Sequence, residues 1–315
     1  MDWRVNMKEN GTNAANTAAV ATRKSIHSAT RMGTVSLTVA DLDRQVEFYK
    51  TLLGFTLHWR RGNKAALGAG REDLLELMEV PGAPRHPQTT GLYHFAVLFP
   101  SRRELARAMA RLFQARYENY PTDHIMTKTT YLDDPEGQTV ELYAESPEDG
   151  TMGIQDGGFF ARRADGSLSN GREPLDVEAL FSNLRPEDVL DQPDPPETKI
   201  GHVHLYVRDV PEAVDFYTQV IGFDDMGSSA RLQAGFVSAG GYHHHVGLNS
   251  WIGHGRPPAP EDSQGLRHFT IVLPDPGSLD EVVQRIRSAD IALEEREEGL
   301  FLRDPSQNGI IIKHS

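Results

Sequence analysis

RMGTVSLTVADLDRQVEFYKTLLGF, at residues 31–55, returns without a gap at 199–223 as KIGHVHLYVRDVPEAVDFYTQVIGF. The two stretches share ten of 25 positions. A second pair repeats in the same way, with GLYHFAVLFP at 91–100 and GLRHFTIVLP at 265–274. The chain is therefore an internal duplication, and each half contains two smaller units of similar pattern.

Each unit follows one order of predicted elements. A strand with alternating apolar and polar residues is followed by a helix with apolar residues at helical spacing, which a glycine closes. Short strands separated by Gly or Asp-Pro turns complete a βαβββ module, which occurs four times and predicts an α+β fold. Modules one and two form a domain at 31–145, and modules three and four form a domain at 198–315. The Pro/Gly/Asp-rich connector at 146–197 contains one short predicted helix near 176–184.

Composition limits the chemistry before any motif is considered. The 315 residues include no Cys and 13 His, and the net charge is −13. Disulfides, thiolate metal sites and cysteine nucleophiles are excluded, so a transition-metal site must use His and carboxylate ligands. The absence of Cys suits a reducing cytoplasm, which is where we expect the protein. The acidic balance argues against a nucleic-acid or membrane partner.

The first 30 residues differ in composition from the repeats. They are polar and small, and they lack the apolar core of a secretory signal. No stretch of the chain approaches the ~18 apolar residues of a membrane span. We therefore expect residues 1–30 to form a flexible arm, or a segment that packs on a neighbouring subunit.

These modules resemble a known superfamily. The pattern D-x6-FY-x4-GF after the first strand, and DPEGQTVELY at 134–143, are similar to the vicinal oxygen chelate proteins. That superfamily includes glyoxalase I, bleomycin-resistance proteins and type I extradiol dioxygenases. IGHVHLYV at 200–207 and VSAGGYHHHVGLN at 237–249 most resemble catechol 2,3-dioxygenases of the bacillus type. The resemblance implies cup-shaped, barrel-like mixed β-sheets, each built from two modules, with helices outside, and a homo-oligomer.

The resemblance also implies where a metal would bind, because the family takes its ligands from the first and last strands of the modules. The first-strand positions of modules one to four are Thr34, His94, His202 and His268. The last-strand carboxylate positions hold Glu76 in module one, Glu141 in module two and Ile311 in module four. Modules two and three together offer His94, His202 and Glu141, the two-His-one-carboxylate set of non-haem Fe(II) oxygenases. We therefore expect modules two and three to share one cup and modules one and four the other, with His268 left as a relic of duplication.

The acid–base residues follow from the same resemblance. Ring-cleaving extradiol enzymes carry a Tyr ten residues before the metal Glu, and Tyr131 has this position. Their acid–base His lies on a last strand, and aligning that pattern on GYHHHVGLN selects His244, with a pKa expected near the ordinary ~6.5. His243 and His245 are the alternatives, and strand alternation would place both on the opposite face.

Two further histidines are candidate pocket residues. His124 precedes Tyr131 by seven residues, whereas the family has a substrate hydrogen-bond donor nine residues before its Tyr. His124 is therefore a candidate donor at a shifted position. His204 shares a face with His202 by period two and is expected to line the substrate pocket.

The activity that the resemblance implies is extradiol ring cleavage. O₂ would be inserted into catechol, or an alkyl or otherwise substituted catechol, to give a 2-hydroxymuconic semialdehyde during aromatic-compound degradation. The cofactor would be Fe(II), with Mn(II) as the alternative. Such a reaction needs no nucleotide cofactor, and GAGRED at 68–73 is not followed by the helix of a dinucleotide fingerprint. The alternatives on the same fold are a hydroquinone-cleaving dioxygenase, a glyoxalase-type isomerase and a non-catalytic ligand-binding protein.

Overall fold

The computed structural model describes residues 25–315, and all four βαβββ modules are present there. Module one comprises β1 (Arg31–Val39), α1 (Leu42–Thr51), β2 (Thr56–Arg61), β3 (Lys64–Ala69) and β4 (Glu72–Glu79). Module two comprises β5 (Gly91–Leu98), α2 (Arg102–Gln114), β6 (Tyr120–Asp123), β7 (Thr127–Asp133) and β8 (Thr139–Glu145). Module three comprises β12 (Lys199–Tyr206), α4 (Val210–Asp215) with a π-helical continuation (Phe216–Ile221), β13 (Asp224–Ser229), β14 (Ala234–Ser238) and β15 (Val246–Asn249). Module four comprises β16 (Gly265–Leu273), α5 (Pro276–Ser288), β17 (Glu294–Arg296), β18 (Gly299–Arg303) and β19 (Gly309–His314).

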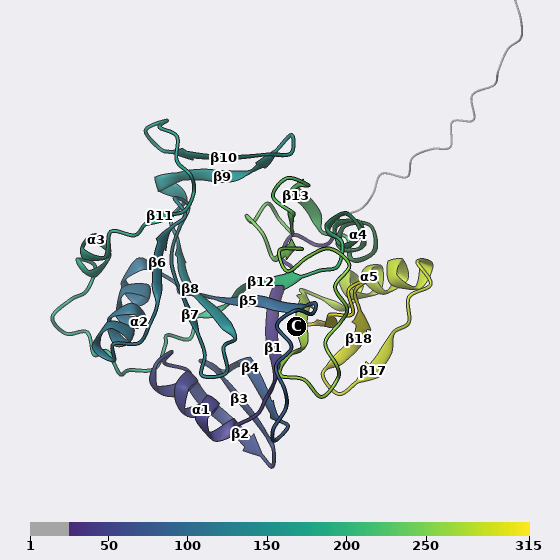
Figure 1. Ribbon diagram of the computed structural model, residues 1–315, viewed down its shortest axis with the longest axis horizontal. Coiled ribbons are helices and arrows are strands. Elements are labelled where there is room, and N and C mark those ends of the chain that lie inside the picture. The colour runs from purple at the N-terminus through teal and green to yellow at the C-terminus, as the bar shows by residue number, and fades with distance from the viewer. Residues whose placement is uncertain (1–24) are drawn as a thin grey trace, which may run out of the picture.

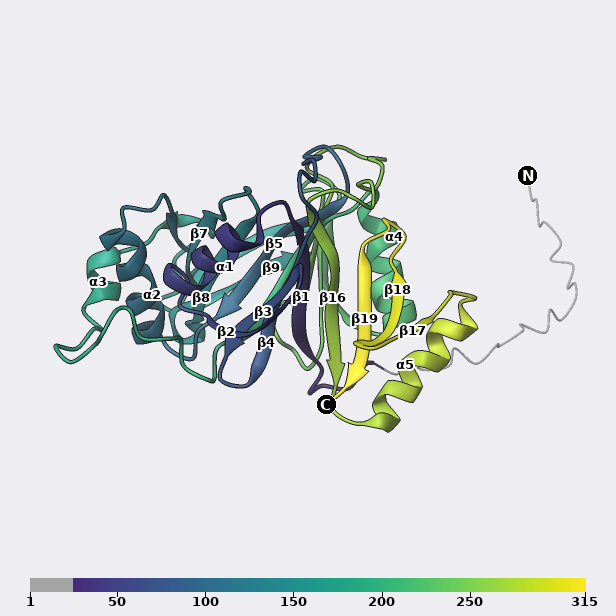
Figure 2. The ribbon, with the colours of Figure 1, turned by 90° about the horizontal axis from the view of Figure 1, so that it is seen from below.

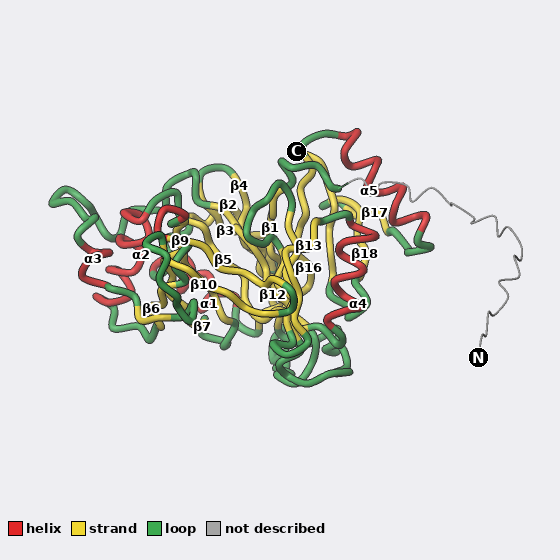
Figure 3. The backbone as a smooth tube through the Cα atoms, turned by 90° about the horizontal axis from the view of Figure 1, so that it is seen from above, coloured by secondary structure: helices red, strands yellow, loops and turns green. Residues whose placement is uncertain are grey.

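The modules pair across the duplication. An eight-stranded sheet combines modules four and one in the order β17-β18-β19-β16-β1-β4-β3-β2, and β1 and β16 join them antiparallel. A nine-stranded sheet combines modules two and three in the order β11-β6-β7-β8-β5-β12-β15-β14-β13, joined by antiparallel β5 and β12 (Figures 1 and 2). The expected pairing of modules two and three is confirmed. Neither sheet closes on itself, so each is an open cup, and the helices lie outside the strands (Figure 3).

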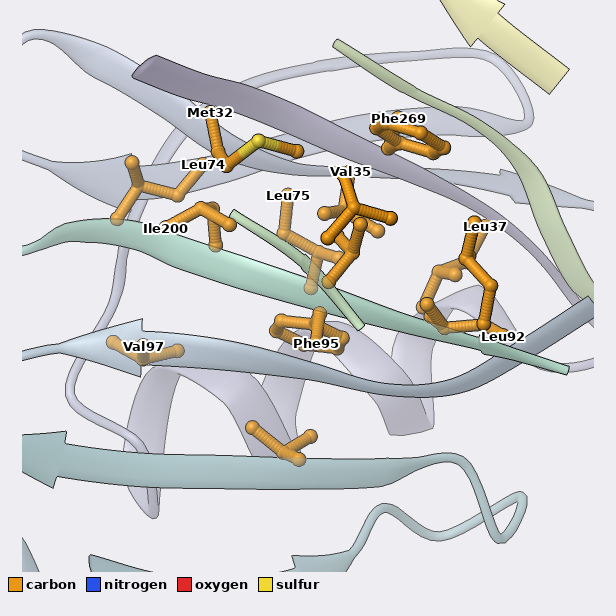
Figure 4. Close-up of a cluster of buried hydrophobic side chains, with 14 of the residues drawn as sticks. Met32, Val35, Leu37, Leu74, Leu75, Leu92, Phe95, Val97, Ile200 and Phe269 are labelled. Carbon is orange, nitrogen blue, oxygen red and sulfur yellow. The ribbon is translucent and has the colours of Figure 1, made fainter. Parts of the chain in front are cut away.

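The hydrophobic core lies between the two sheets. Figure 4 shows Val35, Leu75 and Phe269 of the eight-stranded sheet beside Phe95 and Ile200 of the nine-stranded sheet. All five are buried, with at most 2% of their surface exposed. Because alternate strand residues face opposite ways, the polar residues between these core positions point into the cups.

The repeated FY and DP motifs connect the two sheets. Tyr49 at the end of α1 donates a hydrogen bond of 2.9 Å to Asp134 of module two. Tyr217 makes the equivalent bond of 3.1 Å to Asp304 of module four. Each aspartate also accepts backbone N–H groups of its own turn, including that of Asn308. The motifs therefore fix α1 and the continuation of α4 each to a turn of the other sheet.

Steric constraints require glycine at the two glycine positions of the repeated GF motif. Gly54 and Gly222 adopt φ of 86° and 101°, in the left-handed region that favours glycine. Arg111 and Arg285 donate to carbonyls beside these glycines, Leu53 O and Ile221 O, at 2.6 and 2.7 Å. A Cβ at either glycine would lie within 2.5 Å of the guanidinium.

The connector contains more structure than its composition predicts. It forms a short 3₁₀ turn (Pro147–Asp149), the hairpin β9 (Gly150–Gln155) and β10 (Gly158–Arg163), β11 (Glu173–Pro174) and α3 (Val177–Phe181). The helix lies within the predicted range, whereas the hairpin was not predicted. The hairpin lies across the mouth of the nine-stranded sheet, and Ser229 Oγ on β13 donates to Gly157 O at 2.7 Å (Figure 1).

The segment before β1 is described only from residue 25. Most of the arm expected at 1–30 lies outside the described residues. Ile26 is buried, and its N–H donates to Gly222 O at 2.7 Å, so the described end of the segment packs on module three. Within residues 25–315, no helix has the length and apolar character needed to cross a membrane.

Candidate metal centre and active site

Three neighbouring strands place the candidate metal ligands. Glu141 on β8 and His202 on β12 both pair with Ala96 on β5, which lies between them. Adjacent strands are about 4.8 Å apart, so the two longer side chains can converge above the methyl group of Ala96. His94 lies two residues before Ala96 and points to the same side. The three ligand types predicted from the sequence therefore meet on one face.

The three side chains meet at hydrogen-bonding distance. Glu141 Oε2 lies 3.1 Å from His94 Nε2 and 3.1 Å from His202 Nε2, and the two nitrogens are 3.2 Å apart. Each residue is at least 96% buried. Ligand atoms at right angles around one ion are separated by about 1.4 bond lengths, so this triangle suits bonds of about 2.2 Å, close to those of first-row divalent metals. The donor set therefore fits Fe(II) or Mn(II).

The protonation states also suit a metal. Burial lowers the pKa of His94, so its imidazole is neutral near pH 7. Burial alone would raise the pKa of Glu141, but the charges and hydrogen bonds of His202 and His94 hold it well below its usual range. A carboxylate beside an unprotonated imidazole is the state in which such ligands bind cations.

A threonine that sequence reasoning missed orients the carboxylate. Thr129 Oγ1 lies 2.9 Å from Glu141 Oε1 and 3.0 Å from Leu142 O, so these two oxygens share its proton. The contact with Oε1 leaves Oε2 directed at the histidines. Thr129 is fully buried and lies two residues before Tyr131 on β7. Period-two alternation would have placed it on the same face as Tyr131, and this is the signal that could have identified it.

Tyr131 and His124 form a defined pair beside the ligands. Tyr131 pairs directly with Glu141 across β7 and β8. His124 Nδ1 lies 2.6 Å from Gly171 O, so this nitrogen must carry the proton, and Nε2 accepts from Tyr131 Oη at 3.0 Å. Burial lowers the pKa of His124 and raises that of Tyr131 well above its usual range. The phenol and the neutral imidazole are therefore both available as hydrogen-bonding groups.

The predicted strand through the three consecutive histidines is wrong. β15 begins only at Val246, after a turn in which Gly240 and Gly241 have φ of 64° and 75°. Without strand alternation, His243 and His244 both line the cavity, so the opposite-face prediction for His243 is wrong. His245 does point away, and its Nδ1 accepts the Ala239 N–H at 3.2 Å.

The two cavity-facing histidines lie close to the candidate ligands. The His244 ring centre is 4.3 Å from that of His202. His202, His243 and His244 form a second group with potential ligand atoms within 4.8 Å of one another. Burial lowers the pKa of His244 well below its ordinary value and that of His243 to about 3. The expectation that His244 titrates near ~6.5 is therefore not met, because burial penalises the charged ring.

These side chains open into a cavity of about 780 Å³. His204 lies in its wall above Gly247, where a Cβ would approach the ring to 2.8 Å. Much of the remaining wall is apolar and was not predicted. The connector supplies Met152, Ile154, Phe159 and Phe160, and module three supplies Met226, Leu232, Phe236 and Trp251. The connector sequence shows no regular alternation of apolar and polar residues that would identify these wall residues. A hairpin that covers a cavity needs no alternating buried face.

The other cup lacks an equivalent ligand set. Thr34 Oγ1 donates to Asp73 O at 2.7 Å, and Ile311 replaces the carboxylate of module two. Glu76 pairs instead with Arg267 at 3.4 Å and Lys64 at 3.8 Å. Among residues 25–315, both groups of side chains able to hold a metal lie in the cup of the nine-stranded sheet.

Comparison with known proteins shows which family this sequence resembles. The family model described as the Glyoxalase/Bleomycin resistance protein/Dioxygenase superfamily matches residues 31–142 and 199–310. A catechol-2,3-dioxygenase of Bacillus subtilis (strain 168) is 39% identical over 290 residues, covering 91% of this chain and 98% of that protein.

Solved structures show the same fold at low identity. A candidate dioxygenase from Bacillus subtilis subsp. subtilis strain 168 has a TM-score of 0.60 at 13% identity, covering 93% of this chain and 86% of that one. Glyoxalase I from Zea mays has a TM-score of 0.53 at 16% identity, covering 90% and 92%. The matched ranges, the four modules and the paired cups lead to one assignment. The chain belongs to the glyoxalase/bleomycin resistance protein/dioxygenase superfamily.

Proposed function

We propose that this protein is an Fe(II)-dependent extradiol dioxygenase. It inserts O₂ into catechol, or an alkyl or otherwise substituted catechol, and yields a 2-hydroxymuconic semialdehyde in aromatic-compound degradation. One observation carries the proposal: His94, His202 and Glu141 present three ligand atoms within 3.2 Å of one another at the wall of a 780 Å³ cavity. The 39% identity to a catechol-2,3-dioxygenase supports it.

His94, His202 and Glu141 would hold Fe(II), which would bind the catechol oxygens and O₂ and carry electrons between them. Mn(II) has the same ligand preferences, so the donor set suits either ion.

Proton handling falls to the neutral histidines. His244 lies 4.3 Å, ring to ring, from His202 and makes no hydrogen bond to another described residue. Because burial keeps His244 neutral, it can accept a proton from a catechol hydroxyl and return it later in the reaction. We assign His244 as the acid–base residue, with His243 as the neighbouring alternative.

Tyr131 would donate to a substrate oxygen as negative charge develops on it, and His124 would position the phenol. Gly171 O fixes the His124 tautomer, so Nε2 faces Tyr131 as an acceptor. Tyr131 Oη keeps its proton, which it would turn from His124 Nε2 to the oxyanion when substrate is bound. His204 completes the wall on the other side of His94, with ring centres 5.1 Å apart.

The alternative activities find less support in this geometry. A glyoxalase-type isomerase would need a second carboxylate, and Glu76 belongs to the other sheet, where Arg267 and Lys64 neutralise it. A protein that only sequesters ligands has no need for a buried ligand triad. A hydroquinone-cleaving enzyme would use the same triad, so only the substrate test separates it.

An oxygen electrode tests the proposal. Protein loaded with Fe(II) under anaerobic conditions should consume one O₂ per catechol or methylcatechol when air is admitted. His94→Ala and Glu141→Ala should lose bound iron and at least 100-fold of the activity, since direct ligands exceed the 10–100-fold typical of groups behind them. His254→Ala, at an exposed histidine, is the matched control and should keep both. Iron-loaded protein that consumes O₂ with hydroquinones and not with catechols, or with neither, would contradict the proposal.

A further inference from the structure

A second cavity, of about 400 Å³, lies where the four modules meet. We call it the seam cleft. It is bounded by the ends of β1 and β12, the starts of β5 and β16, and the loops at 84–90 and 257–264 that precede the latter two strands. None of its lining residues lines the catalytic cavity. It is therefore a separate concavity, and the proposed ring cleavage does not use it.

The seam cleft gathers arginine side chains in a chain whose net charge is −13. Four arginines line it, and these are Arg85, Arg267, Arg296 and Arg303. The acidic residues on its wall are Asp134, Glu136 and Glu261. Asp134 is buried in its own turn, Glu136 accepts the backbone N–H groups of Ala40 and Asp41, and Glu261 is 95% exposed. Asp134 and Glu136 are thus held by their own turns, whereas carboxylates lie beside three of the arginines: Glu294 pairs with Arg296 at 2.9 Å, Glu76 with Arg267 at 3.4 Å and Glu261 with Arg303 at 3.7 Å.

Two of the arginines keep their charge available. The Arg85 guanidinium donates to Gly137 O and forms no ion pair with a described residue. Arg303 donates to Gln307 O at 2.9 Å, and its nearest carboxylate is the exposed Glu261 at 3.7 Å. Carbonyl partners hold such side chains in place without neutralising them, and a fork of guanidinium N–H donors suits carboxylates.

Apolar and aromatic side chains form one part of the wall, beside amide and hydroxyl side chains such as Gln138, Gln264 and Thr90. Phe301 lies under the Arg296 guanidinium at 3.4 Å from its ring centre, and Tyr206, Leu92 and Pro258 belong to the same part. Ser263 Oγ also belongs to this wall, is buried, and has no hydrogen-bond partner among the described residues. A buried hydroxyl without a partner is destabilising, and a polar ligand atom would relieve this.

We propose that the seam cleft binds a small aromatic carboxylate. In this proposal the guanidinium groups of Arg85 and Arg303 bind the ligand carboxylate. The Phe301 and Tyr206 rings and Pro258 contact the aromatic ring of the ligand, and Ser263 supplies a further hydrogen bond. The site exists because duplication brings the starts of β5 and β16 together, while the loops and turns around them have diverged into arginine-bearing sequences.

Fluorine NMR with 4-fluorobenzoate tests this on the full chain. A ligand of this size with one charged group should bind with a Kd of about 1 mM. The neutral 4-fluorobenzyl alcohol should bind at least tenfold more weakly, and inorganic phosphate should compete poorly because it lacks the aromatic body. The double variant Arg85→Gln, Arg303→Gln should weaken 4-fluorobenzoate at least tenfold. Arg61→Gln with Arg71→Gln is the matched control, because both arginines are exposed, lie outside both cavities and remove the same charge.

The His94→Ala variant distinguishes the two cavities. Binding in the seam cleft should survive this change, which disrupts the candidate metal centre about which the catalytic cavity is organised. If His94→Ala abolishes 4-fluorobenzoate binding and the double arginine variant leaves it intact, the ligand occupies the catalytic cavity and the proposal is wrong. Equal binding of the alcohol and the acid, or of phosphate and the acid, would overturn the assigned ligand class. Neither result bears on ring cleavage, which the oxygen electrode measures separately.

Discussion

Thr129 shows how one hydroxyl can set the geometry of a metal site. Its bond to Glu141 Oε1 occupies one carboxylate oxygen, so only Oε2 faces His94 and His202. Without that bond the carboxylate could rotate, and the convergence of three ligand atoms would be lost part of the time. Groups that orient metal ligands commonly contribute 10–100-fold to affinity.

We expect Thr129→Val to weaken iron binding by about 10–100-fold and Thr129→Ser to restore it, because valine keeps the shape and serine keeps the donor. Titration of metal-free protein with Fe(II) under anaerobic conditions measures this. Thr130→Val is the matched control, since Thr130 is equally buried but bonds Asn119 on the opposite face at 2.9 Å. It should lower stability by about 1 kcal/mol and leave iron affinity unchanged. Equal effects of the two valine variants on iron affinity would refute the orienting role.

Some site residues could be predicted from the sequence and others could not. His94, His202 and Glu141 could be selected because the family resemblance implies ligands on the first and last strands of the modules, and the repeat alignment identifies those positions here. The neighbours of His244 could not be placed in this way, because Gly240 and Gly241 turn the chain just before β15 begins. A left-handed glycine turn resets the direction of the next side chains, and this change has no period in the sequence.

At the scale of elements, the β9–β10 hairpin determines much of the shape of the catalytic cavity. Phe159 and Phe160 are 42% and 40% exposed, and both line the cavity together with Met152 and Ile154. The candidate metal ligands share with the hairpin a cavity of about 780 Å³, which is far larger than a catechol ring needs. We therefore expect the hairpin to contact a substituent rather than the diol.

We expect the double variant Phe159→Ala, Phe160→Ala to reduce kcat/KM for a phenyl-substituted catechol by about tenfold relative to catechol, because the lost rings bury apolar surface of the substituent. The ratio of the two kcat/KM values is the measurement, since a general loss of folding would lower both equally. Phe113→Ala is the control, because Phe113 is 43% exposed on α2 and packs on Phe181 instead. An unchanged ratio would show that the hairpin does not contact the substituent.

The connector also acts on the site through its backbone. The Gly171 carbonyl fixes the proton of His124 and hence the direction of the Tyr131 hydrogen bond. A sequence shows which residue types a loop contains, but a carbonyl is present at every position, so its partner is known only from the fold. This is why the role of the connector in the site could not be predicted.

For the whole molecule, the Tyr–Asp links bind the two sheets together. Asp304 accepts from Tyr217 and from turn N–H groups, yet burial raises its pKa to about 6. A carboxyl with a raised native pKa stabilises the fold most at low pH, and this stability falls as the pH rises from the ordinary value of about 4 through 6. The Tyr217 hydroxyl counteracts that loss, because it hydrogen-bonds the ionised carboxylate most strongly.

We therefore expect Tyr217→Phe to lower the free energy of unfolding by about 2 kcal/mol at pH 8 and by clearly less at pH 5, where Asp304 is protonated in the native state. Urea denaturation at the two pH values measures the difference. Tyr49→Phe should behave in the same direction, since burial also raises the pKa of Asp134. A loss that is equal at both pH values would mean that the carboxylate charge plays no part.

The sequence by itself determined the four modules, their element order and the residue types of a metal site, because repeats, period-two strands and helical spacing are properties of neighbouring residues. The donor set even indicated that modules two and three share a cup. Only the tertiary structure decided that Ala96 separates Glu141 from His202, that Thr129 and Gly171 orient the side chains beside them, and that a hairpin covers the cavity. Those features depend on distances between residues far apart in the chain. Local sequence patterns do not encode these distances, because the packing of the two sheets fixes them.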